Sequence, residues 1–269
     1  MSARLPRGLK HAGFSAGFIL CSVVLDLFPG VAAAQRIISQ PEKVLSMSKG
    51  ASLLIQNDAT IQRFSIGDPA VAPRLRDAVA WYPDAGGKRL RPVMAMLACE
   101  ASGGTSEAAL PIALAVELVH NFSLVHDDIM DRDATRRGRA TVHVKWDEPT
   151  AILAGDVLFA RAFEVLARIP DAASHRIAAA LLSRTVLRLC EGQALDMAFE
   201  KEERVTTDDY LAMIRGKTAL LFEAATRGGA LSAQDARHAD ALAAYGEAFG
   251  MAFQIVDDVL DVEGTSEVL

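Results

Sequence analysis

Two aspartate-rich motifs, DDIMD at 127–131 and DDVLD at 257–261, each follow an apolar stretch of the chain. On a helix, the first and last aspartates of such a motif share a face and the middle one lies beside them. Two carboxylate clusters that face each other repel unless cations lie between them. Magnesium suits such sites, because it accepts oxygen ligands, keeps several waters and bridges carboxylates to phosphates. The two motifs together predict a magnesium-diphosphate site, whereas one motif alone is more often a solvated acidic helix end.

Basic residues accompany the acidic motifs, and three of them crowd into one glycine-containing segment. AGGKRLRP at 85–92 places Lys88, Arg89 and Arg91 directly after a glycine pair. Paired glycines let the backbone approach an anion closely, and a helix N-terminus favours one. The other basic residues of interest are Arg136, Arg137 and Lys217. Side chains of this kind bind diphosphate, although each basic pair taken singly is more often surface charge.

Long apolar stretches at helical spacing occupy the chain from about residue 73 onward. Short breaks with Gly, Pro, Asp or Ser separate them, and no parallel-sheet pattern lies between them. The composition agrees, because the chain is 51% hydrophobic with only 6% aromatic residues. We therefore predict an all-α bundle of at least seven helices over residues 73–269, which carries both acidic motifs.

The N-terminal part of the chain has a different character. Residues 1–34 have the layout of a secretory signal peptide, with an apolar run at 14–28 and AAA at 32–34. The alternative is a disordered or artefactual leader. Residues 35–72 alternate apolar and polar residues in short runs, which predict a small β-rich segment ending in GDPAVA. This segment resembles the N-terminal part of secretin-type outer-membrane and pilus-assembly proteins.

A more specific resemblance covers residues 73–269. GGKRLRP, LVHDDIMDRDATRRG, GQALD, the KT pair at 217–218 and FQIVDDVLD occur in the order and spacing of the trans-isoprenyl diphosphate synthases, the polyprenyl synthetase family. The resemblance implies an isoprenoid-synthase helical bundle around a central cavity. It implies isopentenyl diphosphate and an allylic diphosphate as substrates, and Mg²⁺ as cofactor, with three ions when diphosphate is bound.

The resemblance also implies roles for single residues. The implied metal ligands are Asp127, Asp128, Asp131, Asp257, Asp258 and Asp261. The implied contacts to isopentenyl diphosphate are Lys88, Arg91, His120 and Arg137. The residues implied beside the allylic diphosphate and the reacting carbons are Arg136, Lys217, Thr218 and Gln254. Spacing alone would make His120 a core histidine.

The implied reaction is an ionisation, a condensation and an elimination. Metal ions and cationic side chains stabilise the diphosphate as it leaves, so that an allylic carbocation forms. The double bond of isopentenyl diphosphate attacks this cation, and a proton is then lost to the departing diphosphate. Apolar walls exclude the water that would quench the cation. No nucleophilic serine or cysteine is needed, and no such constellation is visible.

The resemblance implies that product length depends on the residues just before the first acidic motif. Phe122 lies five residues before Asp127, the small Ser123 lies four before it, and DDIMD has no two-residue insertion. That combination resembles the archaeal-type short-chain geranylgeranyl diphosphate synthases, so we expect a C20 product. Phe122 would be the floor beneath the growing tail, and the alternative is that it is ordinary core packing.

Other expectations concern partners, location and extent. The net charge of −6 argues against a nucleic-acid partner, and the three cysteines form neither a disulfide framework nor a metal spacing. We expect a homodimer through the helical domain. We expect the cytoplasm for the synthase domain, a location with which the leader conflicts. Family members continue for several helices beyond the second motif, so we also expect a C-terminally truncated bundle.

The short C-terminus and the unusual N-terminal segment suggest other possible functions. One is a non-catalytic subunit or inactive fragment of the same family, favoured by the short C-terminus. Another is an exported secretin-like module with a passenger domain, which rests on residues 1–72 alone. Terpene cyclases share an aspartate-rich site, but they usually lack GGKRLRP and the second acidic motif. The intact motifs favour the prenyltransferase.

Overall fold

The computed structural model describes residues 73–233 and 236–263. In chain order, its elements are α5 (Pro73–Ala80), the 3₁₀ turn η1 (Pro83–Ala85), α6 (Leu90–Ala101), α7 (Leu110–Met130), β1 (Thr135–Arg136), β2 (Arg139–Ala140), α8 (Val142–Lys145), α9 (Glu148–Leu166), α10 (Ala172–Phe199), α11 (Thr207–Ile214), the π-helix η2 (Arg215–Ala219), α12 (Leu220–Leu231), η3 (Ala236–His238) and α13 (Ala239–Glu263). The leader at 1–34 and the β-rich segment at 35–72 lie outside the described residues, so both stay predictions.

The predicted all-α architecture is confirmed, with one small addition. β1 and β2 pair as an antiparallel hairpin, in which Thr135 lies opposite Ala140 and Arg136 opposite Arg139. The connection is a two-residue loop, and its residues Arg137 and Gly138 both have positive φ angles, 51° and 71°. That is the conformation of the common type I′ hairpin turn. Strands of two residues are too short to leave an alternating pattern in the sequence, so the hairpin was not anticipated.

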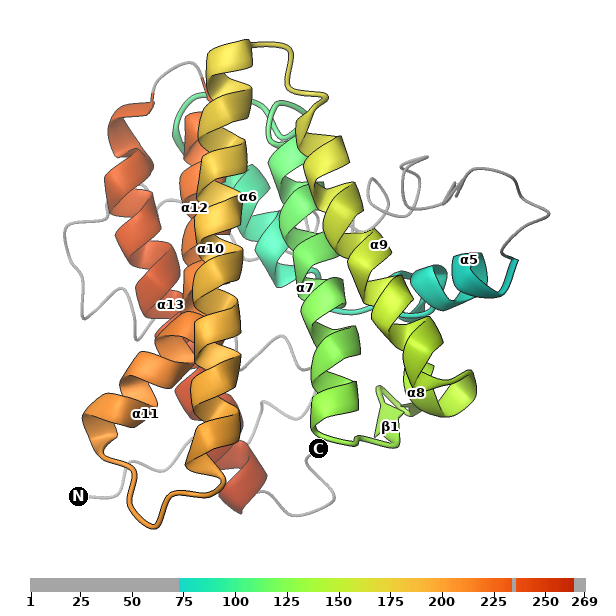
Figure 1. The fold of residues 1–269 in the computed structure, drawn as a ribbon. Coiled ribbons are helices and arrows are strands. Elements are labelled where there is room, and N and C mark those ends of the chain that lie inside the picture. Colours follow the sequence, from blue (N-terminus) through green and yellow to red (C-terminus); the bar gives the residue numbers. More distant parts are fainter. Residues whose placement is uncertain (1–72, 234–235, 264–269) are drawn as a thin grey trace, which may run out of the picture.

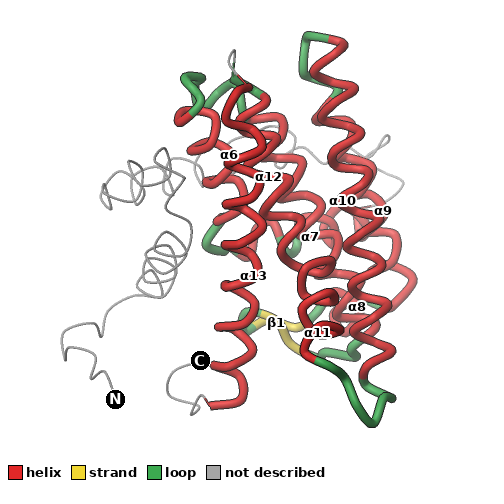
Figure 2. The backbone as a smooth tube through the Cα atoms, turned by 90° about the vertical axis from the view of Figure 1, so that its left-hand side faces the viewer, coloured by secondary structure: helices red, strands yellow, loops and turns green. Residues whose placement is uncertain are grey.

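The long helices run side by side along the molecule (Figure 1). α7 packs against α9, while α6, α12 and α13 form a second group around α12. α10 is the longest helix, with 28 residues, and it contacts α7, α9 and α12. The view turned by 90° shows α6, α12 and α13 together, with α9 and α10 farther across the bundle (Figure 2).

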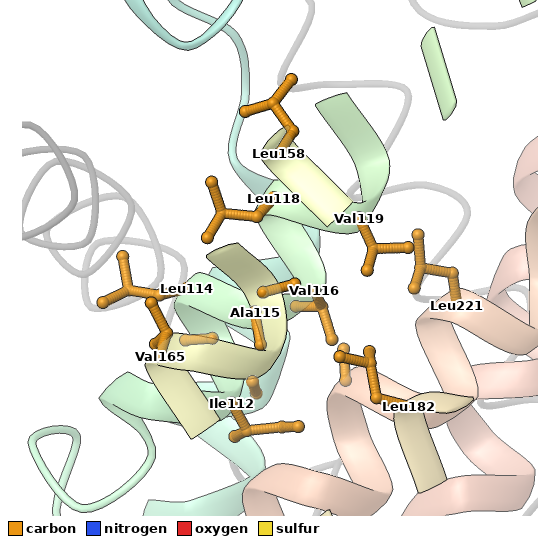
Figure 3. Packing of buried hydrophobic residues seen from close by; sticks show 14 of the residues in the cluster. Ile112, Leu114, Ala115, Val116, Leu118, Val119, Leu158, Val165, Leu182 and Leu221 are labelled. Carbon is orange, nitrogen blue, oxygen red and sulfur yellow. The ribbon is translucent and has the colours of Figure 1, made fainter. Parts of the chain in front are cut away.

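The main core lies where α7, α9, α10 and α12 meet. Figure 3 shows Leu118 and Val119 of α7 with Leu158 of α9, Leu182 of α10 and Leu221 of α12, all 2% exposed or less. Side chains from four helices thus lose their water together, and burying each one stabilises the fold by about 1.5–3 kcal/mol. This shared core fixes the positions of the helices that carry the polar motifs.

α7 is enclosed by the rest of the bundle. Every residue from 112 to 119 is buried, including the charged Glu117. A helix that is apolar on all sides belongs in an interior, so Glu117 requires a partner there. Although α7 is so apolar, none of the helices in the described ranges is long and apolar enough to cross a membrane.

Candidate active site

The two acidic motifs lie toward the same end of the bundle. α7 and α13 both end in the lower part of Figure 1, where the β1–β2 hairpin also lies. α7 ends at Met130, and Asp131 caps it with its N–H donating to the carbonyl of Asp127 at 2.8 Å. The second motif lies within α13, although the side chain of Asp261 is outside the described part of the structure.

Among the described residues, Asp127 and Asp131 form no direct ion pair, although the charge of Lys217 acts on both. Burial raises the pKa of Asp127 to about 7, against the opposing charge of Lys217. Asp131 is exposed, but partial burial also raises its pKa, again against Lys217. Among the described residues, the side chain of Asp127 has no hydrogen-bond donor. A divalent cation would supply the positive charge that this pair needs.

Asp128 has a different environment from its neighbours in the motif. It is fully buried, and Tyr82 donates its hydroxyl hydrogen to one carboxylate oxygen. Nε of Arg136 donates to the other oxygen at 2.5 Å. Burial and the bond to Asp128 raise the pKa of Tyr82. Asp128 thus fixes Arg136, for which the family resemblance implied a place beside the allylic diphosphate. Its own role as a metal ligand stays a prediction.

The KT pair connects the two motifs. Lys217 forms an ion pair with Asp196 of α10, and its charge acts on Asp127 and Asp131. Its neighbour Thr218 donates from Oγ1 to Oε1 of Gln254 in α13 at 2.7 Å. Both residues lie in the π-helix η2, a rare element that is frequent at functional sites.

Two glycines permit this arrangement. A Cβ atom at Gly192 of α10 would lie 2.2 Å from the backbone nitrogen of Lys217, and one at Gly216 would lie 2.8 Å from the carbonyl oxygen of Arg188. Only glycine at both positions allows η2 to pass so close to α10. Because neither glycine has a side chain, η2 packs close to α10, and Lys217 can reach Asp196.

In the second motif, Asp258 belongs to a hydrogen-bonded chain. Nε2 of Gln254 donates to one carboxylate oxygen at 2.8 Å, and the hydroxyl of Tyr210 donates to the other. Asp257 is exposed, and its charge acts on Arg91. The second motif therefore faces both the allylic-side residues and the basic cluster.

Three cations, Lys88, Arg91 and Arg137, form a basic cluster, and the charge of Asp257 in the second motif acts on one of them, Arg91. Burial lowers the pKa of Arg91 to about 10, its guanidinium lies 4.3 Å from the centroid of the Phe222 ring, and its Nε has no partner among the described residues. Nη1 of Arg137 donates to the carbonyl of Gly86 at 2.7 Å. Lys88 is exposed. These cations lie outside any direct ion pair with a carboxylate in the described structure, so they are available to an anion.

His120 lies among these cations. Burial lowers its pKa well below the ordinary value, and the charges of Arg91 and Arg137 lower it further. The imidazole is therefore neutral at pH 7, so it can donate one hydrogen bond but adds no charge to the cluster.

Phe122 lies in a row of aromatic rings. Its centroid is 5.0 Å from that of His126 and 5.3 Å from that of Phe159, which in turn is 5.3 Å from Phe163. Ser123 is buried, and its hydroxyl donates to the carbonyl of His120 at 2.9 Å. The contacts of Phe122 are compatible both with a floor beneath a tail and with core packing.

Several polar residues of the site were missed by the sequence analysis. They are Tyr82, Glu117, Asp196 and Tyr210. Glu117 could have been noticed, because it is the one charged residue in the apolar run ALAVELV. Arg89 was grouped with Lys88 and Arg91, yet it is buried and paired with Glu117. The tyrosines carry no signal in the sequence that separates them from ordinary core aromatics.

The described residues contain no ready-made cluster of three or more His, Cys, Asp or Glu side chains that could hold a metal ion. The aspartates of the two motifs lie near the end of α7 and in α13. This distribution fits a metal that is held jointly by protein and phosphate oxygens, which is how Mg²⁺ usually binds.

Comparison with known proteins gives a consistent result. The model of the family described as polyprenyl synthetase matches residues 72–269. The chain is 49% identical over 205 residues to the geranylgeranyl diphosphate synthase of Methanosarcina mazei, covering 75% of this chain and 63% of that protein. It is 50% identical over 186 residues to a short chain isoprenyl diphosphate synthase of Methanothermobacter thermautotrophicus, covering 69% of this chain and 57% of that protein. The chain thus spans about three fifths of the length of these relatives.

A solved structure agrees with these relatives. The crystal structure of geranylgeranyl pyrophosphate synthetase from Pyrococcus horikoshii has a TM-score of 0.77 and 41% identity, covering 84% of this chain and 68% of that one. The match therefore extends from the motifs to the arrangement of the helices. On its motifs, its fold and its matched length, the chain belongs to the polyprenyl synthetase family.

Proposed function

We propose that this chain is a magnesium-dependent prenyltransferase, which condenses isopentenyl diphosphate with an allylic diphosphate to give a C20 prenyl diphosphate. One observation carries the proposal. Lys217 and Thr218 connect two aspartate motifs. The charge of Asp257 in the second motif acts on Arg91, and the guanidinium groups of Arg91 and Arg137 are in no direct ion pair among the described residues. Such a site can bind two diphosphates, one through carboxylate-held metal and one through cations.

The acidic residues of the two motifs would bind the metal. Asp127 and Asp131 would hold Mg²⁺ from α7, and Asp257, Asp258 and Asp261 from α13. When bound, Mg²⁺ supplies positive charge to the diphosphate oxygens and stabilises them as a leaving group. Asp128 holds Arg136 through its buried hydrogen bond.

The chain's own groups orient the reaction. Arg136 and Lys217 stabilise the negative charge that develops as the allylic carbon–oxygen bond breaks and diphosphate leaves with the electron pair. The alkene of isopentenyl diphosphate, held by Lys88, Arg91, His120 and Arg137, then donates its electrons to the allylic carbon. Loss of a proton to the released diphosphate restores the double bond and balances the charge.

The experiment that tests this function is an assay of the purified chain. Isopentenyl diphosphate is supplied with dimethylallyl, geranyl or farnesyl diphosphate in the presence of Mg²⁺, and the dephosphorylated products are separated by chromatography. We expect C20 alcohols, and we expect EDTA to abolish their formation. A folded chain that binds both substrates and forms no product would instead identify a non-catalytic member of the family.

The expected homodimer through the helical domain stays a prediction.

The first variant tests the basic cluster. Replacing the exposed Lys88 with alanine should weaken the use of isopentenyl diphosphate, because one charge-assisted hydrogen bond worth about 1.5–3 kcal/mol is lost. The expected loss in kcat/KM is about tenfold to a hundredfold. The matched control is Lys201→Ala, another exposed lysine, in the turn after α10. Steady-state kinetics for Lys88→Ala equal to those of the control would contradict the assignment.

The second variant tests the chain-length hypothesis. Replacing Phe122 with alanine should open space beneath the allylic tail and shift the products toward longer chains. Five helical residues span about 7.5 Å, which is the scale of one or two isoprene units, and a dry apolar void is a natural place for an apolar tail. Product length is measured by chromatography of the dephosphorylated products.

The control for Phe122 lies in the same aromatic row. Phe163→Ala removes an equal ring from α9, two contacts away from Phe122, and should leave product length unchanged. If Phe122 is ordinary core, both variants should lose about 3–5 kcal/mol of stability and make the wild-type products. That outcome would remove the residue-level support for a C20 product.

A further inference from the structure

The glycine-rich segment before α6 has an unusual backbone. Gly86 and Gly87 have φ angles of 80° and 133°, and Arg89 has a φ angle of 48°. Left-handed conformations are easy for glycine, but they are disfavoured for a residue with a Cβ atom. A strained residue of this kind persists only when its surroundings hold it. The contacts of Arg89 therefore indicate what holds the segment.

The guanidinium of Arg89 ties the segment to the core. One nitrogen, Nη2, donates to the carbonyl of Pro83 at 2.5 Å, which joins the two ends of the glycine-containing loop. The other, Nη1, pairs with Glu117 in the middle of α7, and both side chains are about 5% exposed or less. Asn121, one turn along α7, donates from Nδ2 to the carboxylate of Glu117 at 3.1 Å. Arg89 and Glu117 are thus each held by two contacts.

The arginines of the site therefore fall into two kinds. Arg89 and Arg136 each pair directly with a buried carboxylate, Glu117 and Asp128 respectively. Arg91 has no such direct pair among the described residues. Glu117 and Asp257 only raise its pKa through their charges, at a distance. Arg136 uses Nε for Asp128 and keeps further N–H donors for an anion. Arg89 uses both of its Nη atoms, for Glu117 and the carbonyl of Pro83. It cannot bind a substrate anion without leaving the buried Glu117 alone, so its role must be exerted through neighbouring residues.

Arg89 stands between two residues of the proposed diphosphate site. Lys88 precedes it directly, and Arg91 follows two residues later in the first turn of α6. Because the backbone of Arg89 is fixed, the direction in which the chain enters α6 is fixed, and with it the starting points of both side chains. A loop freed from this constraint would have to order itself each time a diphosphate binds.

We propose that Arg89 and Glu117 form a positioning pair, which holds Lys88 and Arg91 in place to bind the diphosphate of isopentenyl diphosphate. The inference rests on the proposed function for the identity of that substrate. Neither member of the pair touches the substrate. The pair acts on affinity by holding the binding groups in advance of binding.

The decisive variant removes both members together. Arg89→Met with Glu117→Leu replaces a buried ion pair by apolar side chains of similar volume, a change that stable folds often tolerate. It removes one positive and one negative charge, so the net charge of the site is unchanged. Any loss of anion affinity then reports on position and not on the electrostatic field. The single variant Glu117→Gln is less informative, because it leaves the Arg89 guanidinium buried without its partner.

The first measurement is the Kd for inorganic pyrophosphate without metal, by titration calorimetry. We expect the double variant to bind about tenfold more weakly than the wild type. The second measurement is the KM for each substrate, and we expect a similar rise for isopentenyl diphosphate with the KM of the allylic diphosphate unchanged. The control, Arg188→Gln with Glu191→Gln, removes an exposed ion pair of α10 and should leave both quantities unchanged.

The outcomes separate this inference from the proposed function. A folded double variant with the wild-type Kd for pyrophosphate would overturn the positioning role, whatever the chain catalyses. A wild-type chain that forms no prenyl product would contradict the function while leaving the comparison of Kd values valid. If circular dichroism shows the apolar double variant to be unfolded, Arg89→Gln with Glu117→Gln, which keeps hydrogen-bonding groups at both positions, takes its place under the same criteria.

Discussion

Replacing Asp127 with asparagine should lower turnover by about 100-fold to 1,000-fold, the range found when one electrostatic contribution to a developing charge is removed. The change keeps the shape of the side chain and removes its negative charge. The protein and the diphosphate together should then bind Mg²⁺ more weakly. The free energy of unfolding should stay the same or rise, because the wild-type carboxylate is partly buried without a hydrogen-bond donor among the described residues.

Three measurements check this expectation. They are kcat at saturating Mg²⁺, the Mg²⁺ concentration that gives half-maximal rate, and urea unfolding followed by circular dichroism. Asp208→Asn, at an exposed position in the first turn of α11, is the control for loss of one negative charge. Turnover of Asp127→Asn within about threefold of the control, far below the effect of a lost electrostatic contribution, would exclude Asp127 as a metal ligand.

Much of the fold could be predicted because its signal is repeated along the chain. Apolar residues at helical spacing recur in every long helix, and α7 in particular is buried on all sides over residues 112–119. The hairpin and the π-helix could not be predicted in the same way. β1 and β2 have two residues each and η2 has five, and such lengths leave no periodicity that distinguishes them from a turn or an α-helix.

The residue types of the site could be predicted from the sequence, but not which of their side chains are exposed and which are buried and paired. GGKRLRP presents three basic residues that look alike in sequence, and the structure exposes Lys88 while it buries Arg89. Arg89 also has a positive φ angle, which the presence of an arginine in the sequence does not predict. In the same way, DDIMD presents equivalent aspartates, of which only Asp128 meets Tyr82 and Arg136. Partners that come from distant parts of the chain decide these roles.

Replacing Asp128 should therefore have a different effect from replacing Asp127. Replacing Asp128 with alanine leaves the hydroxyl of Tyr82 and the guanidinium of Arg136 without their common buried acceptor, and Arg136 keeps only its longer contact with Asp133, at 3.6 Å. Removing one partner of a buried ion pair typically costs about 3–5 kcal/mol, so urea unfolding should show a loss of this size. Activity should fall as well, because Arg136 loses the contact that holds it near the allylic diphosphate.

Two further variants separate the contacts of Asp128. Asp128→Asn keeps an oxygen acceptor, so it should lose only about 1–3 kcal/mol. Tyr82→Phe removes one hydrogen bond to a charged group and leaves Arg136 paired, so it should lose about 1.5–3 kcal/mol with smaller effects on turnover. If Asp128→Ala instead loses less than about 1 kcal/mol, well under the typical cost of a broken buried pair, and shows the Mg²⁺ dependence of Asp127→Asn, Asp128 is a metal ligand like its neighbour. The buried pair with Arg136 would then not be the state in which the site works.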